Sequence, residues 1–220
     1  MGNIYFLNFD SKSDFLPTYS VAIHRSQFRK ELALRLANIV LKEEYNILTS
    51  TKKPEHDPDT TWLTGRLWEY NFLDFDYPEI AEFKEFIKEQ FLDFLNKTNH
   101  AIPKNVYTQC WANILRKNGR RITAHHHCEA HTGAPQEYSY VSGNVCVQSK
   151  DTKTYYKNPF NETRIGIDNV DGELVLFPSY VIHQTDANNN DSPRISIAFD
   201  IITDEVYNMI DNNKNFRKLL

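Results

Sequence analysis

Two stretches of this chain contain the residue types that bind a transition metal. One is the run His125-His126-His127-Cys128-Glu129, and the other is a single histidine, His183, far downstream. Imidazole nitrogens and carboxylate oxygens are the ligands of non-haem iron(II), and two histidines with one carboxylate leave coordination positions open for other molecules. These residues therefore predict an iron(II) centre at which chemistry can take place.

The histidine run offers two ways to supply the first pair of metal ligands. Residues i and i+2 of a strand point to the same side, so His127 can act with Glu129, or His125 with His127, while the residues between them face away. His183 would complete the set from another strand. Because a carboxylate offsets part of the charge of iron(II), the chemistry favours His127, Glu129 and His183, with His125 as the alternative ligand.

Arg194 and Ser196 begin a segment of strict alternation eleven residues after His183. One face of this predicted strand is apolar and carries Ile195, Ile197, Phe199 and Ile201. The other face carries Arg194, Ser196, Ala198 and Asp200. A guanidinium pairs with a carboxylate through two parallel N–H bonds. Arg194, assisted by Ser196, is therefore predicted to hold a dicarboxylic acid beside the metal.

Helices are predicted in the first half of the chain. Apolar residues recur at helical spacing from Phe28 to about Leu41, with Ser26 as a candidate N-cap. A second helix is predicted from Pro78, a favoured first-turn residue, to about Lys97. The first 25 residues are predicted to be extended or irregular.

The segment between these two helices, residues 46–78, is predicted to be a long loop. Loops of this length in a compact domain often act as lids or binding elements. Trp62 and Trp68 are candidates to anchor it.

Strands are predicted after residue 105, where Gly, Pro and Asn clusters separate apolar runs. The predicted strands are Val106–Leu115, Tyr138–Gln148, Arg164–Ile167, Glu173–Phe177 and Arg194–Ile202, with a short helix after Thr203. Helices followed by a run of antiparallel strands favour a β-barrel or sandwich with helices covering one sheet. The 220 residues are predicted to form one domain, with a helical support region and loop at 1–104, a β core at 105–202 and a C-terminal helix at 203–220.

Composition narrows the class of protein further. The net charge is −4 and charges of both signs are mixed along the chain, so there is no clear nucleic-acid surface. Three widely spaced cysteines without a CxxC motif indicate a reduced, cytoplasmic protein. No run is long enough to cross a bilayer, so no membrane association is expected. The sequence does not reveal an oligomeric state.

With these motifs in view, the chain resembles the 2-oxoglutarate/iron(II) oxygenase superfamily, and within it the 2OG-Fe(II) oxygenases frequent in tailed phages and marine bacteria. The resembling segments cover roughly half of the chain. They are Trp111-Ala-Asn113 with Gly119, the histidine run, Tyr140-Val-Ser142-Gly143, and Gly172 through Phe199.

The resemblance implies a double-stranded β-helix, the jelly-roll or cupin-like barrel, with the N-terminal helices packed on one sheet. It makes His183 the distal iron ligand and Arg194 the partner of the 5-carboxylate of 2-oxoglutarate, assisted by Ser196. The resemblance also implies that Asn113 helps to bind the co-substrate or a substrate. The wider superfamily shows His-x-Asp/Glu at the first ligand position and the closer group often shows His-x-His. Both occur here, and the interpretation retains Glu129.

The predicted activity is therefore an iron(II)- and 2-oxoglutarate-dependent dioxygenase that uses O2 to hydroxylate a C–H bond and releases succinate and CO2. The substrate would be a small molecule or a protein side chain. The alternative is a non-catalytic or zinc-binding cupin-like barrel that binds a ligand or partner. The Arg194/Ser196 pair argues against this alternative, because a structural metal site needs no carboxylate clamp.

Overall fold

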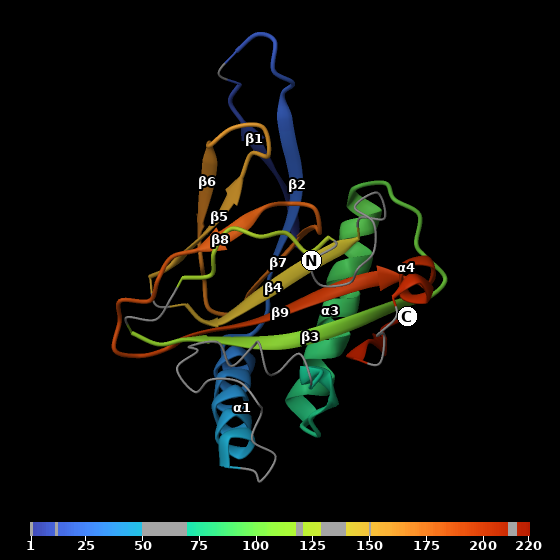
Figure 1. Cartoon of the computed structure of the whole chain (residues 1–220). Helices are drawn as coiled ribbons and strands as arrows, with labels where there is room; N and C mark the ends of the chain where they lie inside the picture. Colours follow the sequence, from blue (N-terminus) through green and yellow to red (C-terminus); the bar gives the residue numbers. More distant parts are fainter. Residues whose placement is uncertain are drawn as a thin grey trace.

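The computed structural model describes residues 2–11, 13–49, 70–117, 121–128, 140–149, 151–210 and 215–220. The predicted lid with Trp62 and Trp68 lies largely outside these residues, as do Gly119 and Glu129. Two antiparallel sheets form the described fold (Figure 1). The double-stranded β-helix that the family resemblance implies is the fold found.

The larger sheet has seven strands in the order β1-β2-β7-β4-β9-β3-β10. Their bounds are β1 Asn3–Phe9, β2 Tyr19–Gln27, β7 Glu173–Pro178, β4 Val141–Gln148, β9 Arg194–Thr203, β3 Val106–Leu115 and β10 Arg217–Lys218. The smaller sheet has three strands in the order β6-β5-β8. These are β6 Arg164–Asp168, β5 Lys153–Lys157 and β8 His183–Thr185.

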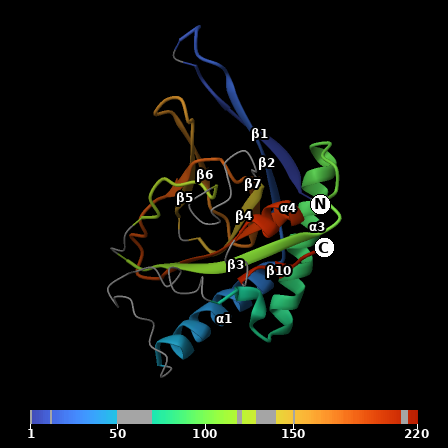
Figure 2. The same cartoon turned by 45° about the vertical axis from the view of Figure 1, so that its right-hand side comes forward.

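Two long helices, α1 (Lys30–Thr49) and α3 (Pro78–Lys97), lie on one side of the larger sheet (Figures 1 and 2). The bounds of α3 agree with the prediction, because Pro78 opens its first turn and its apolar residues return every three or four positions. These residues pack on the outward side chains of β3, β4, β7 and β9. Gly143 of β4 makes this packing possible, since a Cβ there would lie 2.6 Å from Cζ of Phe199.

The start of α1 differs from the prediction. Ser26 is not an N-cap, because it lies within β2, and the helix begins at Lys30 and continues to Thr49. The first 25 residues, predicted to be extended or irregular, are extended over most of their length and form a β1–β2 hairpin that projects beyond the rest of the fold (Figure 1). A short 3-10 turn, η1 (Phe72–Asp74), precedes α3.

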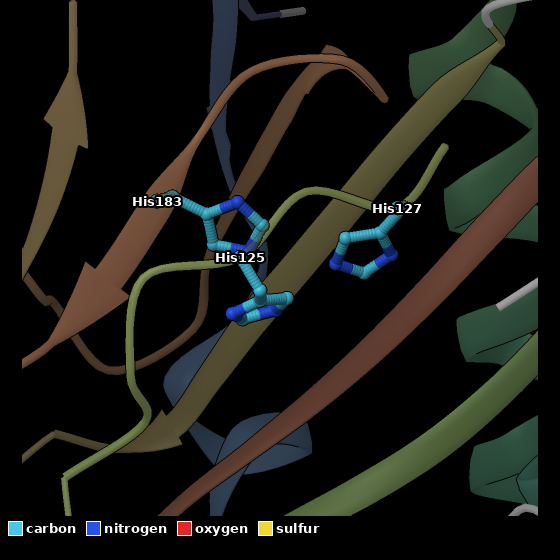
Figure 3. Close-up of side chains that lie close together, drawn as sticks. All are labelled: His125, His127 and His183. Carbon is cyan, nitrogen blue, oxygen red and sulfur yellow. The ribbon is translucent and has the colours of Figure 1, made fainter. Parts of the chain in front are cut away.

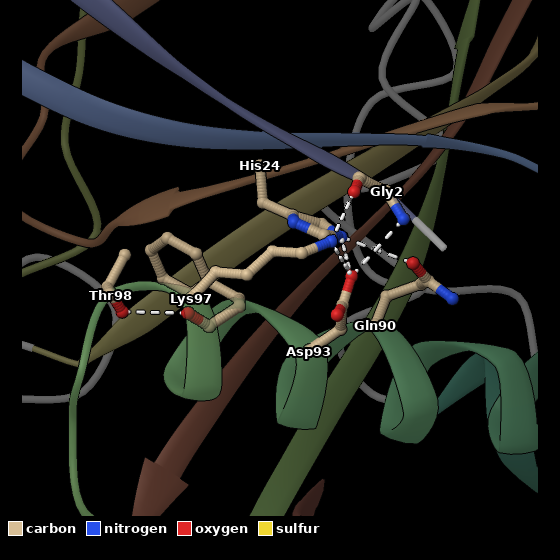
Figure 4. A network of polar contacts seen from close by, with 7 residues as sticks. Gly2, His24, Gln90, Asp93, Lys97 and Thr98 are labelled. Atoms are coloured by element: carbon tan, nitrogen blue, oxygen red, sulfur yellow. Dashed lines mark hydrogen bonds and ion pairs between the residues drawn. The ribbon is translucent and has the colours of Figure 1, made fainter.

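A polar network fixes this hairpin to α3 (Figure 4). His24 of β2 is fully buried, and its Nε2 lies 3.1 Å from Oε1 of Gln90 and 3.8 Å from Oδ2 of Asp93. The same carboxylate accepts hydrogen bonds from the backbone N–H of Gly2 (3.2 Å) and from Nζ of Lys97 (2.7 Å). His24 had no predicted role.

The C-terminal segment is only partly helical. α4 covers Asp204–Met209, which confirms the short helix predicted after Thr203. The predicted helix over 203–220 is wrong at its end, because Arg217 and Lys218 pair with Thr108 and Tyr107 of β3. No helix of the described residues is long and apolar enough to cross a membrane.

Candidate metal centre and co-substrate site

Three histidines from two separate segments point toward one another between the two sheets (Figure 3). One nitrogen from each of His125, His127 and His183 lies within 4.8 Å of the others. Two backbone hydrogen bonds join His125 to His183, with N···O distances of 3.0 and 2.9 Å. The N–H of His127 donates to the carbonyl of Ser179 at 2.9 Å. The backbone thus holds the three rings around a common point.

The second nitrogen of each ring makes a hydrogen bond that sets the orientation of the ring. Nδ1 lies 2.8 Å from the Thr123 carbonyl in His125, and 3.0 Å from the Val181 carbonyl in His183. In His127 it lies 2.7 Å from Oδ1 of Asp200. Carbonyl and carboxylate oxygens accept hydrogen bonds only, so each Nδ1 carries the proton and Nε2 is the nitrogen able to coordinate a metal.

Aromatic side chains enclose the buried part of this histidine cluster. Trp111 of β3 stacks on His127 with ring centroids 5.7 Å apart, and Phe177 of β7 meets His183 at 4.8 Å. His127 and His183 are buried, whereas His125 is partly exposed. A molecule would therefore reach the centre past His125.

Arg194 lies on the inner face of the larger sheet and is 2% exposed. Its Nε and Nη1 have no hydrogen-bond partner among the described residues. Burial raises the pKa of the neighbouring Cys146 thiol to about 11, although Arg194 opposes this shift. The thiol is therefore neutral near pH 7 and does not compensate the guanidinium. A buried cation without an anionic partner fits a site that receives a carboxylate.

Ser196 and Asn113 share the inner face with Arg194. Ser196 pairs in register with Asn113 of β3 on one side and with Cys146 of β4 on the other. Both Ser196 and Asn113 are buried. The structure thus places the three predicted co-substrate residues on one surface, and the residues present fit a dicarboxylic acid.

The run 125–128 differs from the predicted strand. Among its described residues only His125 forms a β-bridge, and the chain then turns. Cys128 is buried, and its Sγ lies 3.2 Å from Oγ of Ser179. Isolated backbone bonds to Ser179 and His183, rather than a strand ladder, position this segment. Of the four predicted metal ligands the structure brings together His125, His127 and His183.

Asp200 is the residue of this site that sequence reasoning did not assign. Alternation along β9 places it on the face of Arg194, and that position was the available signal. Its carboxylate receives hydrogen bonds from His127 and, at 2.7 Å, from Oγ of Ser142.

Comparison with known proteins gives one family match. Residues 109–200 match the model of the family described as "Putative 2OG-Fe(II) oxygenase". A search of curated proteins finds no match to this chain.

Solved structures of low sequence identity share the fold. A Pseudomonas putida prolyl-4-hydroxylase aligns with a TM-score of 0.55 at 12% identity, covering 82% of this chain and 87% of that one. The non-heme alpha ketoglutarate dependent carbocyclase SnoK aligns at 0.56 and 8% identity, covering 90% and 92%. CytC3, determined with Fe(II) and alpha-ketoglutarate, aligns at 0.52 and 13% identity, covering 81% and 71%. The predicted family resemblance and β-helix fold are confirmed.

Proposed function

We propose that this chain is a 2-oxoglutarate-dependent non-haem iron oxygenase that hydroxylates a substrate C–H bond. One C–H group, O2 and 2-oxoglutarate would give one C–OH group, succinate and CO2. Bound iron(II) and 2-oxoglutarate would supply the oxidising chemistry. The protein would bind, orient and shield the reactants.

The convergence of three histidine rings carries this proposal. His127 and His183, with Nδ1 held as a donor, would present Nε2 to iron(II). His125 is the third ligand that the described residues offer. Glu129, the carboxylate favoured on chemical grounds, is the competing third ligand. Either set leaves positions open for the co-substrate and O2.

Arg194 would bind the far carboxylate of 2-oxoglutarate, with Ser196 and Asn113 beside it. The two unpartnered guanidinium nitrogens supply donors for a carboxylate. Since Arg194 is buried, the pairing would fix the co-substrate in one orientation rather than merely attract it. The aromatic rings of Trp111 and Phe177 would exclude water from the buried side of the centre.

The substrate would be a small molecule or a protein side chain, entering on the partly exposed side of His125. A prolyl-4-hydroxylase and a carbocyclase share this fold, so the fold accommodates both kinds of substrate. We also place the protein in the cytoplasm, because its three cysteines are free and buried.

Anaerobic addition of iron(II) and 2-oxoglutarate tests the proposal. A charge-transfer absorption band is expected only when both are present, because the co-substrate must chelate a metal held by the histidines. Succinate should form once O2 is admitted. A protein that gives no band and no succinate, and that carries stoichiometric zinc, would support the zinc-binding barrel instead.

Two further variants identify the third ligand. His125→Gln should abolish the band and Glu129→Gln should retain it if iron is held by the three histidines. The reverse pattern would assign Glu129. Both variants change one candidate ligand and leave His127 and His183 in place, so each serves as the control for the other.

A further inference from the structure

Asp200 lies deep in the interior beside the histidine cluster. It is 1% exposed and occupies the inner face of β9, near the end opposite Arg194. Its Oδ1 accepts two short hydrogen bonds, from Nδ1 of His127 and from Oγ of Ser142, both at 2.7 Å. A carboxylate this deeply buried is costly unless its charge is compensated.

The hydrogen bond to Asp200 distinguishes His127 from the other two histidines. Nδ1 of His125 and of His183 bonds to neutral backbone carbonyls, whereas Nδ1 of His127 bonds to a carboxylate. A carboxylate behind a histidine fixes its tautomer and increases the basicity of the ligating nitrogen. His127 is therefore positioned to be the strongest donor of the three.

The charge of the centre gives Asp200 a second role. Three neutral imidazoles contribute no negative charge to a divalent cation, and the described histidine cluster contains no carboxylate. Asp200 supplies one negative charge through the His127 ring. The buried carboxylate and a bound cation would neutralise each other. The hydrogen bonds from His127 and Ser142 to Asp200 bring no opposite charge and cannot do this.

We propose that Asp200 is the positioning carboxylate of the metal centre: it holds the His127 ring with Nε2 toward the metal and provides the negative charge that the three-histidine set lacks. This inference rests on the proposed function, since it concerns the same metal. Asp200 acts through His127 and does not itself bind the metal.

Anaerobic titration with Co(II), whose absorption reports coordination, tests the inference in Asp200→Asn. The amide has nearly the same shape but no charge. Co(II) affinity should fall about 10- to 100-fold, the range found when such outer carboxylates are lost. Asp200→Glu, which keeps the charge, should recover part of the affinity.

Glu44→Gln is the matched control, because Glu44 is a buried carboxylate paired with Arg116 at 2.6 Å, away from the histidines. Its Co(II) affinity should equal that of the wild type.

Folded Asp200→Asn with wild-type Co(II) affinity and spectrum would overturn the inference and leave the proposed function intact. A wild-type protein that binds no Co(II) would instead overturn the metal centre itself. If Asp200→Asn does not fold, histidine-labelled ¹⁵N spectra of the wild type with and without Zn(II) decide. The inference requires that Zn(II) shift the Nε2 signal of His127 while its Nδ1 stays protonated, and Zn(II) on Nδ1 would refute it.

Discussion

At the level of single residues, the inner face of β9 carries two buried side chains of opposite charge, and they differ in how many hydrogen-bond partners they have. Asp200 already accepts hydrogen bonds from His127 and Ser142. Arg194 is equally buried, yet two of its nitrogens have no partner among the described residues. An unpartnered buried charge lowers the stability of the protein that holds it. Arg194 is therefore expected to serve binding at the expense of stability.

Arg194→Met tests whether Arg194 lowers the stability of the protein while it serves co-substrate binding. The variant without ligands should be as stable as the wild type or more stable, by roughly 1–4 kcal/mol, because an uncompensated buried charge is replaced by an apolar side chain. Its affinity for 2-oxoglutarate should fall about 100-fold or more, the equivalent of about 3 kcal/mol. Denaturant unfolding and anaerobic 2-oxoglutarate titration measure the two effects.

The matched control is Arg25→Met. Arg25 makes two hydrogen bonds to Glu173, at 2.9 and 2.8 Å, so its loss should destabilise the protein and leave 2-oxoglutarate affinity unchanged. An Arg194→Met protein that is less stable but still binds the co-substrate would show that Arg194 has a structural role only.

At the scale of elements, the contact of β2 with α3 contains a titratable group. Burial lowers the pKa of His24 below its usual value of 6.5, although Gln90 and Asp93 oppose the shift. The unfolded chain then binds more protons than the folded protein between the folded pKa and 6.5. Stability from this residue is complete above pH 6.5 and is lost as the pH falls toward the folded pKa.

His24→Gln should make the free energy of unfolding less sensitive to acid. Glutamine keeps a polar group beside Gln90 and Asp93 but does not titrate. Urea unfolding at pH 7.5 and pH 5.5 should show a smaller loss of stability for the variant than for the wild type, whatever their absolute stabilities. The other histidines are present in both proteins and cancel in the comparison. Equal losses would remove His24 as a source of acid sensitivity.

The elements recognised from sequence were those with a long, one-sided pattern. The helix α3 and the strands β3 and β9 each bury a continuous apolar face, and their predicted bounds lie within one residue of those observed. β8 is only three residues long, too short for alternation to be visible. Most of β1 is exposed and its hydrophobic pattern is weak. The second half of α1 is largely polar, which hid its continuation past Leu41.

The site was predictable to a similar degree, because chemistry and spacing identify residue types but not every contact. His127, His183, Arg194 and Ser196 stand out by type and register. The link from Asp200 to His127 spans distant segments that only the folded sheet brings together. The placement of His125 depends on its backbone bonds to His183, which no local pattern indicates.

At the scale of the whole molecule, the site joins the two sheets of the barrel. His183 belongs to the smaller sheet, while Asp200 and Arg194 belong to the larger one. The Cα atoms of Asp200 and Arg194 are roughly 20 Å apart along β9, at about 3.3 Å per residue. The histidines and the guanidinium of Arg194 lie on the same interior side of the larger sheet, and a short diacid is proposed to bridge a metal held by the histidines and Arg194. Metal and co-substrate would then stabilise the same arrangement of sheets.

Binding of the two should therefore be coupled in thermal unfolding under anaerobic conditions. 2-Oxoglutarate alone should raise Tm only slightly, because it then binds Arg194 without a metal to chelate. Iron(II) alone should raise Tm by compensating Asp200. Together they should raise Tm by more than the sum of the two shifts, since each ligand increases the affinity for the other and binding to the folded state stabilises it. The Arg194→Met protein, which keeps the histidines, should retain the shift from iron and lose the excess. Strictly additive shifts in the wild type would mean that metal and diacid bind at independent places, and the single shared site proposed here would be wrong.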